Sequence, residues 1–318
     1  MSTSDDPSQR IFLEEDIFLN FVLNKILSLG KTFFERLFEK ETGLSKSAHC
    51  INDLHILVKR NYKITRGDEV DMLIKLRVLV NNEDYNVYIP VEVKALHGDF
   101  KRSIGQALFL KETFGTSIII IPGEMKSYLF KQDIYHNVLR KENIGLILFE
   151  KDTFDVRVRI SLNESLIDTL IRKSAQFDLQ DRLSGLIDLL RCEREKLQKL
   201  SAILKRGSSN RTAISSALGD KSLFSSLLRT FAVSNTRLEY FSTNNILRDL
   251  LARNLNIKAA FLLFLSIDSK IIRELLVARY ATEMTHYLFE KYSLHEAGLE
   301  GPEQLAKLCE ELIPETLT

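Results

Sequence analysis

Two carboxylates and one ammonium group are spaced in this chain so that they could act together. Asp71 lies in the segment GDEVDMLIKLRVLV, and Glu92 and Lys94 lie in the next apolar segment, YNVYIPVEVKA. Carboxylate oxygens are the ligands that Mg²⁺ prefers, and an ammonium group can stabilise negative charge that develops during a reaction. The three residues would therefore suit metal-assisted hydrolysis, provided that the fold brings them together.

Both segments show the alternation of a β-strand. In the first, apolar residues alternate with a set that begins at Asp71. In the second, every other residue is apolar, and Glu92 and Lys94 belong to the remaining set. Because successive side chains of a strand point to opposite faces, this period of two predicts two strands, each with its candidate residues on the more polar face.

The polar stretch NNED between the two strands favours a short turn. If the hairpin closes with Val80 opposite Tyr85, Asp71 faces Lys94. Glu92 is then the diagonal neighbour of Asp71, at roughly 7–8 Å between backbones. A cation held between the two carboxylates would fit this arrangement.

Two interpretations of these charges are open from the residues alone. In one, all three are solvated on the wet face of a hairpin. In the other, the face is enclosed, because a long helix and the apolar segment 118–121 follow and would cover the sheet. Pro90 cannot donate a ladder hydrogen bond, which indicates an irregular or edge position beside the charged pair. We favour the enclosed site.

Asp71 followed by Glu92-Val93-Lys94 resembles the motif of the PD-(D/E)XK nuclease superfamily, which includes many restriction enzymes, archaeal Holliday-junction resolvases and RecB-type nuclease domains. The usual proline of that motif is replaced by Val70. The resemblance covers roughly residues 30–160. It implies an α/β fold, a restriction-endonuclease-like mixed sheet flanked by helices.

The expected order of elements fits the core that this resemblance implies. A helix broken near Gly30 precedes a first strand and the motif hairpin. A helix capped by Asp99 and ended by Gly115 follows, and then a strand that stops at Pro122. The predicted ranges outside the hairpin are 11–39, 55–64, 99–114, 116–121, 126–141, 145–150 and 154–160.

The resemblance also implies roles for individual residues. Asp71, Glu92 and the backbone carbonyl of Val93 would bind Mg²⁺, for which Mn²⁺ can substitute. Lys94 would orient the attacking water or stabilise the developing charge. Superfamily members often carry a glutamate on the first helix, where Glu35 is the candidate and Glu15 the alternative.

The helix after the lysine supplies further candidates. Gln106 matches a glutamine that RecB-like members carry there, and Arg102 lies one turn earlier on the same helical face. With Lys101, Arg102 is a candidate for binding nucleic acid. Each of these residues could equally be an ordinary exposed residue of a helix.

Composition sets limits on the function. The net charge is +1, so any binding of nucleic acid needs a local groove rather than an overall basic surface. Cys50, Cys192 and Cys309 lack the spacing of a zinc or iron–sulfur site, and no Gly-rich phosphate loop occurs. The polar N-terminus and the short apolar stretch 259–267 predict neither a signal peptide nor a membrane span. We expect a cytoplasmic protein without membrane partners.

The second half reads as helical throughout. We therefore predict a nuclease domain over residues 1–160 and an all-α accessory domain over 161–318, for DNA binding, homodimerisation or partner docking. The segment 211–229 is loosely similar to a helix-turn-helix, but a plain helical hairpin is the interpretation that its helical surroundings favour.

These expectations converge on one activity and one alternative. The activity is Mg²⁺-dependent hydrolysis of nucleic acid by a DNA endonuclease in restriction, defence or repair. The alternative is a catalytically silent member of the same fold that serves as a DNA-binding or assembly module.

Overall fold

A computed structural model describes residues 14–40, 49–63, 69–96, 99–125, 133–150, 153–253, 255–278 and 282–317. The chain forms two compact units. The first comprises residues 1–82 and 87–170, and the second comprises residues 83–86 and 171–318. The sequence predicted the division after residue 160, whereas the units divide within a helix after Leu170.

The first unit alternates helices and strands along the chain. Two elements, β4 and α7, each have one end in the second unit. The elements are α2 (Glu15–Leu29), α3 (Lys31–Leu37), β1 (Phe38–Lys40), β2 (His49–Lys63), β3 (Glu69–Val80), β4 (Glu83–Val93), α4 (Phe100–Phe114), β5 (Ile118–Pro122), η1 (Gly123–Met125), α6 (Asp133–Lys141), β6 (Gly145–Glu150), β7 (Thr153–Val158), β8 (Ile160–Leu162) and α7 (Glu164–Phe177).

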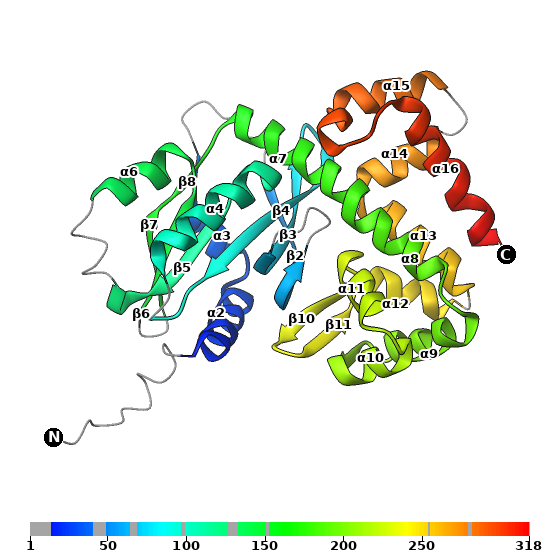
Figure 1. Cartoon of the computed structure of the whole chain (residues 1–318), viewed down its shortest axis with the longest axis horizontal. Coiled ribbons are helices and arrows are strands. Elements are labelled where there is room, and N and C mark those ends of the chain that lie inside the picture. The colour runs from blue at the N-terminus through cyan, green and yellow to red at the C-terminus, as the bar shows by residue number, and fades with distance from the viewer. Residues whose placement is uncertain are drawn as a thin grey trace. The chain divides into compact units, whose positions relative to one another are not determined.

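Six strands, all labelled in Figure 1, form one mixed sheet in the order β2-β3-β4-β5-β6-β7. β2 pairs antiparallel with β3. The strands β4, β5 and β6 run parallel to one another, and β7 pairs antiparallel with β6. The short strands β1 and β8 pair separately. Since parallel strands need a crossover between them, α4 connects β4 to β5. The predicted mixed sheet flanked by helices is confirmed at this level.

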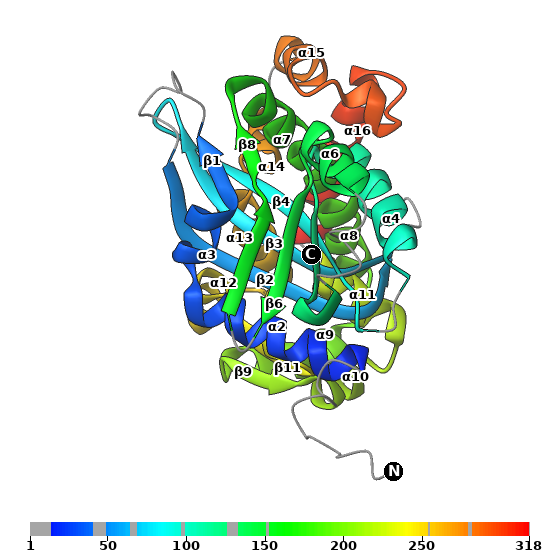
Figure 2. The same ribbon diagram turned by 90° about the vertical axis from the view of Figure 1, so that its left-hand side faces the viewer.

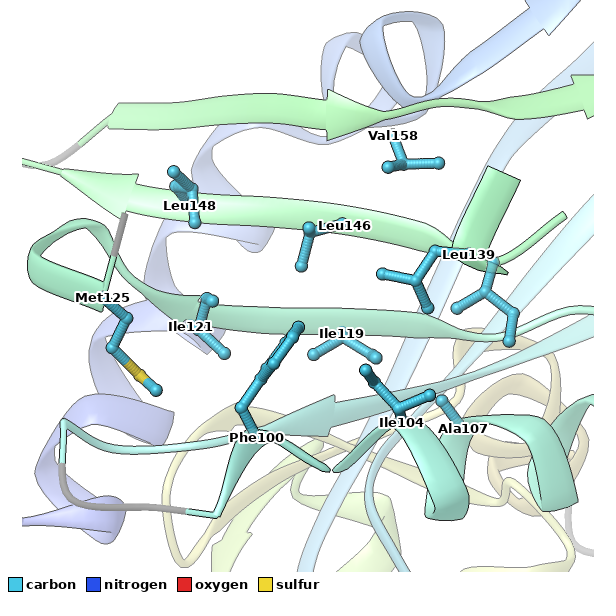
Figure 3. Close-up of a cluster of buried hydrophobic side chains, with 11 residues drawn as sticks. Phe100, Ile104, Ala107, Ile119, Ile121, Met125, Leu139, Leu146, Leu148 and Val158 are labelled. Carbon is cyan, nitrogen blue, oxygen red and sulfur yellow. The ribbon is translucent and has the colours of Figure 1, made fainter. Parts of the chain in front are cut away.

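Helices cover both faces of the sheet. On one face, Phe18 of α2 contacts Phe149 edge-to-face with ring centroids 5.7 Å apart, and Phe33 of α3 contacts Phe154 at 5.1 Å. On the other face, α4 and α6 enclose a buried apolar cluster that contains Phe100, Ile104, Ala107, Ile119, Ile121, Met125, Leu139, Ile144, Leu146, Leu148 and Val158 (Figure 3). Burial on both faces explains the uninterrupted isoleucine run of β5.

The predicted helix boundaries around the candidate site are confirmed. The Asp99 carboxylate accepts hydrogen bonds from the backbone N–H groups of Lys101 and Arg102 and so caps α4. Gly115 ends α4 with a φ of 89°, a left-handed conformation that glycine adopts without steric cost. Gly30, with a φ of 49°, separates α2 from α3 as expected.

The second unit is mainly helical. Its elements after α7 are η2 (Asp178–Leu183), α8 (Ser184–Leu190), α9 (Arg194–Lys205), β9 (Ser208–Asn210), α10 (Arg211–Leu218), α11 (Lys221–Arg229), β10 (Val233–Arg237), β11 (Tyr240–Thr243), α12 (Asn245–Ala252), α13 (Ile257–Asp268), α14 (Lys270–Ala278), α15 (Thr282–Lys291), η3 (Leu294–Ala297) and α16 (Pro302–Leu317) (Figure 1).

The prediction of an all-α second half is wrong for β9, β10 and β11, which form an antiparallel sheet in the order β10-β11-β9. Strands of three to five residues are too short for their alternation to be distinguished from helical periodicity.

A buried ion network lies within the second unit. Arg182, in the π-helical turn η2, is fully buried. Its guanidinium donates to Asp178 Oδ1 at 3.1 Å, to Asp268 Oδ2 at 2.5 Å and to the carbonyl oxygen of Thr230 at 2.9 Å. Because buried charges must be paired and hydrogen-bonded, this arginine joins three distant segments of the unit.

Over the described ranges, no single helix is both long enough and apolar enough to cross a membrane. Helices α2 and α3 meet that length and composition only when taken together, and they are bent by 99° where they meet.

Candidate active site

The β3–β4 hairpin closes through a tighter turn than the sequence predicted. β3 ends at Val80 and β4 begins at Glu83, so Asn81 and Asn82 alone form the turn. Their φ angles are 51° and 65°, as in the two-residue turns that match the twist of a hairpin. In an uninterrupted ladder this turn sets Asp71 directly opposite Glu92. The observed register differs from the predicted one by two residues. Because side chains alternate between faces with a period of two, the three candidate residues still lie on one face of the sheet.

The structure brings Asp71, Glu92 and Lys94 together (Figure 2 shows the adjacent strands β3 and β4). Lys94 Nζ lies 2.6 Å from Glu92 Oε1 and 3.9 Å from Asp71 Oδ2. The backbone N–H of Val93 donates to Asp71 Oδ2 at 2.8 Å. The two strands therefore assemble one cluster with a net charge of −1 when both carboxyls are ionised.

This cluster is enclosed rather than lying on a wet hairpin face. Glu92 is only 1% exposed, while the side chains of Asp71 and Lys94 are 23% and 14% exposed. Glu92 is in register with Ile119 of the parallel strand β5, and Ile119 belongs to the cluster packed against α4. Neighbours in register share a face, so Glu92 lies on the face that α4 covers, with access from the side of Asp71 and Lys94.

Burial strongly perturbs the two carboxyl groups. Loss of solvation, together with the negative charge of Asp71, raises the pKa of Glu92 to about 7, although Lys94 opposes the shift. Burial also raises the pKa of Asp71, against the opposing effects of Lys94 and the Val93 N–H. Two carboxyls held together in an enclosed site disfavour their joint ionisation, which is typical of sites that accept a cation or a proton.

Lys94 behaves differently. Burial by itself would lower the pKa of its ammonium group, but the charges of Asp71 and Glu92 outweigh burial, so that the pKa is raised above its ordinary value. At neutral pH Lys94 is therefore a fixed positive charge and not a general base.

The raised pKa of Glu92 makes the stability of the metal-free protein depend on pH. A carboxyl that titrates at 4.5 when unfolded and at about 7 when folded binds more protons in the folded state between these values, so stability falls as pH rises through this window. We expect Glu92→Gln to stabilise the fold at pH 8 by up to about 3 kcal/mol. The gain should vanish near pH 4.5. Urea unfolding in EDTA across this pH range tests this, and a gain independent of pH would contradict it.

The donor set fits a hard divalent cation with few protein ligands. Within the described ranges, no group of three or more His, Cys, Asp and Glu side chains could hold a metal. Asp71 and Glu92 would be the two side-chain ligands of a bound cation, beside the carbonyl of Val93 that the family resemblance implies. Mg²⁺ suits such a site because it commonly binds one or two carboxylates and keeps several waters. A cation there would also offset the cost of ionising two buried carboxyls.

The candidates on α4 lie outside the contacts of this cluster. Lys101 and Arg102 are exposed on the first turn of the helix. Gln106 is half-buried, and its Oε1 atom is buried without a hydrogen-bond partner among the described residues. The roles predicted for these three residues stay predictions.

The two glutamates of the first helical region differ in their environment. Glu35, the preferred candidate, pairs with Lys31 at 3.6 Å and is 58% exposed. Glu15, at the start of α2, instead contributes to the raised pKa of Lys94 and is therefore the one whose field reaches the site. The sequence favoured Glu35 through the family resemblance, and no local signal showed that Glu15 would be the glutamate with an electrostatic effect on Lys94.

The different electrostatic environments of these two residues yield a prediction. We expect Glu15→Gln to change the cleavage rate more than Glu35→Gln, which should stay within about twofold of the native rate, because only Glu15 of the two contributes to the raised pKa of Lys94. Single-turnover rates at saturating Mg²⁺ measure this difference. A larger loss for Glu35→Gln would reverse the assignment.

Sequence comparison adds no relative to this picture. No protein-family model matches the chain, and no curated protein matches it.

Proposed function

We propose that this protein is a metal-dependent nuclease that hydrolyses phosphodiester bonds in DNA, as an endonuclease of restriction, defence or repair. One observation carries the proposal: two enclosed carboxyls with raised pKa values share a lysine ammonium that lies 2.6 Å from one and 3.9 Å from the other. A purely structural ion pair needs one carboxylate. The second makes the cluster suited to a divalent cation.

Each residue has a distinct role in this proposal. Asp71 and Glu92 would hold Mg²⁺ or Mn²⁺, with the carbonyl of Val93 as a further ligand. The bound metal supplies a water of lowered pKa and polarises the phosphoryl group. The Val93 N–H fixes the orientation of the Asp71 carboxylate through its 2.8 Å hydrogen bond. The hairpin thus sets the ligand geometry before substrate binds.

Lys94 would act on the substrate rather than on the proton of the attacking water. Its raised pKa keeps the ammonium charged, so it stabilises negative charge on the phosphate and positions the nucleophile by donating hydrogen bonds. The exposed Lys101 and Arg102 on the first turn of α4 would contact neighbouring phosphates.

A cleavage screen tests the proposal. Single- and double-stranded DNA and RNA are incubated with the full chain in Mg²⁺, in Mn²⁺ and in EDTA, with Lys94→Ala as the control. We expect DNA to be cut in either metal, and neither EDTA nor Lys94→Ala to support cutting. Equal cutting by Lys94→Ala, or no cutting of any substrate in either metal, would contradict the proposal, and the latter would favour a silent module.

A further inference from the structure

The segment 194–243 has the topology of a helix-turn-helix followed by a β-hairpin, and we call it the winged segment. Helix α9 leads into β9, helices α10 and α11 follow, and β10 and β11 form the hairpin (Figure 1). β11 pairs antiparallel with both β10 and β9, so the hairpin closes back on the strand that precedes the two helices. A plain helical hairpin, the interpretation favoured from sequence, lacks this sheet.

The turn between α10 and α11 is built like that of a helix-turn-helix. Gly219 ends α10 with a φ of 67°, and the Asp220 carboxylate accepts a hydrogen bond from the backbone N–H of Ser222 to cap α11. Phe224 of α11 contacts Phe241 of β11 edge-to-face at 5.7 Å. The second helix is therefore fixed against the hairpin.

Helix α11 has one covered part and one free part. Ser226 donates to Asp188 of α8, and Arg229 lies 3.6 Å from the same carboxylate. At the start of the helix, Lys221 and Ser222 are exposed. In a helix-turn-helix, the N-terminal residues of the second helix are those that reach base edges in the major groove. The cover by α8 leaves that part open.

Positive charge concentrates in the winged segment. Residues 194–243 contain nine lysines and arginines and three acidic residues, a local net charge of +6 in a chain whose total is +1. Two of the acids are engaged locally: Asp220 caps α11, and Glu239 pairs with Arg211 at 2.9 Å. Lys221 and Arg237 are exposed on the helix and on the hairpin, respectively.

The surface chemistry favours a polyanion over a protein partner. The winged segment is described throughout, and its one exposed large hydrophobic residue is Tyr240, at 42%. Arg237 stacks over that ring at 3.9 Å from its centroid. Protein interfaces concentrate apolar anchors at their centre, whereas nucleic-acid sites are polar and basic.

We propose that the winged segment binds double-stranded DNA, with the start of α11 in the major groove and the β10–β11 hairpin on the adjacent backbone. Lys221 is the basic residue on the helix, and Arg237 is the basic residue on the hairpin. The proposal does not require the nuclease activity, because binding is measured without divalent ions. B-form DNA is the duplex whose major groove admits a helix, whereas the groove of duplex RNA is too narrow.

Fluorescence anisotropy with a labelled DNA duplex in EDTA tests the proposal on the full chain. We compare the native protein with the double variant Lys221→Glu, Arg237→Glu. The matched control is Lys141→Glu, Lys307→Glu, two exposed lysines whose reversal alters the net charge equally. We expect the first variant to weaken binding at least about tenfold and to flatten the salt dependence, and the control to bind within about twofold. Duplex RNA should bind more weakly than DNA.

Three results would overturn the proposal: no binding of duplex DNA by the native chain, an unchanged affinity in the Lys221→Glu, Arg237→Glu variant, or an equal loss in the control. Circular dichroism confirms that each variant is folded before its affinity is compared. Binding without cleavage would support the winged segment while contradicting the nuclease, so the two proposals fail separately.

Discussion

Glu92→Gln is expected to reduce metal-dependent DNA cleavage by about a hundredfold to a thousandfold, the range found when one group that stabilises reacting charge is removed. Glutamine has the shape of glutamate but carries no charge. The substitution therefore removes one proposed metal ligand and the closer partner of Lys94, at 2.6 Å, without opening a cavity. Initial rates at several Mg²⁺ concentrations measure the loss.

Glu112→Gln provides the control for this prediction, because Glu112 is an exposed carboxylate on α4. The Glu112→Gln variant carries the same chemical change outside the cluster, and it should cut DNA at the native rate. A Glu92→Gln protein that cuts within about threefold of the native rate would show that the cluster is not the active site. Misfolding is not an explanation for the expected loss, since this variant should be the more stable one at pH 8.

Arg182→Met is expected to destabilise the second unit by about 3–5 kcal/mol, the cost of leaving a buried charge without its partner. Arg182 is fully buried and donates to Asp178 and Asp268, which are 3% and 0% exposed. Methionine fills much of the volume but leaves both buried carboxylates without the guanidinium that pairs with them. Urea unfolding monitored by circular dichroism measures the change.

Arg172→Met is the matched control, the same substitution in the same unit. Arg172 pairs with Glu296 at 2.9 Å, but each side chain is 34% exposed. Exposed ion pairs contribute little, so this variant should lose less than about 1 kcal/mol. Similar losses for the two variants would mean that the buried network has no special role in the stability of the unit.

Strong local signals made much of the first unit predictable. Asp99 and Gly115 marked both ends of α4, and the alternation of β3 and β4 placed the three candidate residues on one face. The turn between β3 and β4 was harder to predict, because the stretch NNED allows two turns whose registers differ by two residues. Both keep the same faces, so the error left the cluster intact.

The second half shows what the sequence could not reveal. The strands β9 and β11 pair only after two helices and a turn intervene, and three polar residues form β9. Likewise, nothing local in the sequence marks Arg182 as buried, because its partner Asp268 is 86 residues away. Lys75, on the face of β3 that carries Asp71, is fully buried although lysine is usually exposed. Burial of a charge depends on distant partners.

Calorimetric titration of Mn²⁺ into the full chain and into its Glu92→Gln variant at pH 8, without nucleic acid, tests the proposed metal site most directly. We predict saturable binding to the native protein, with an affinity at least about tenfold weaker in the variant, because one of two carboxylate ligands is gone. Binding of equal affinity in both proteins, or none in either, would contradict a metal site formed by Asp71 and Glu92.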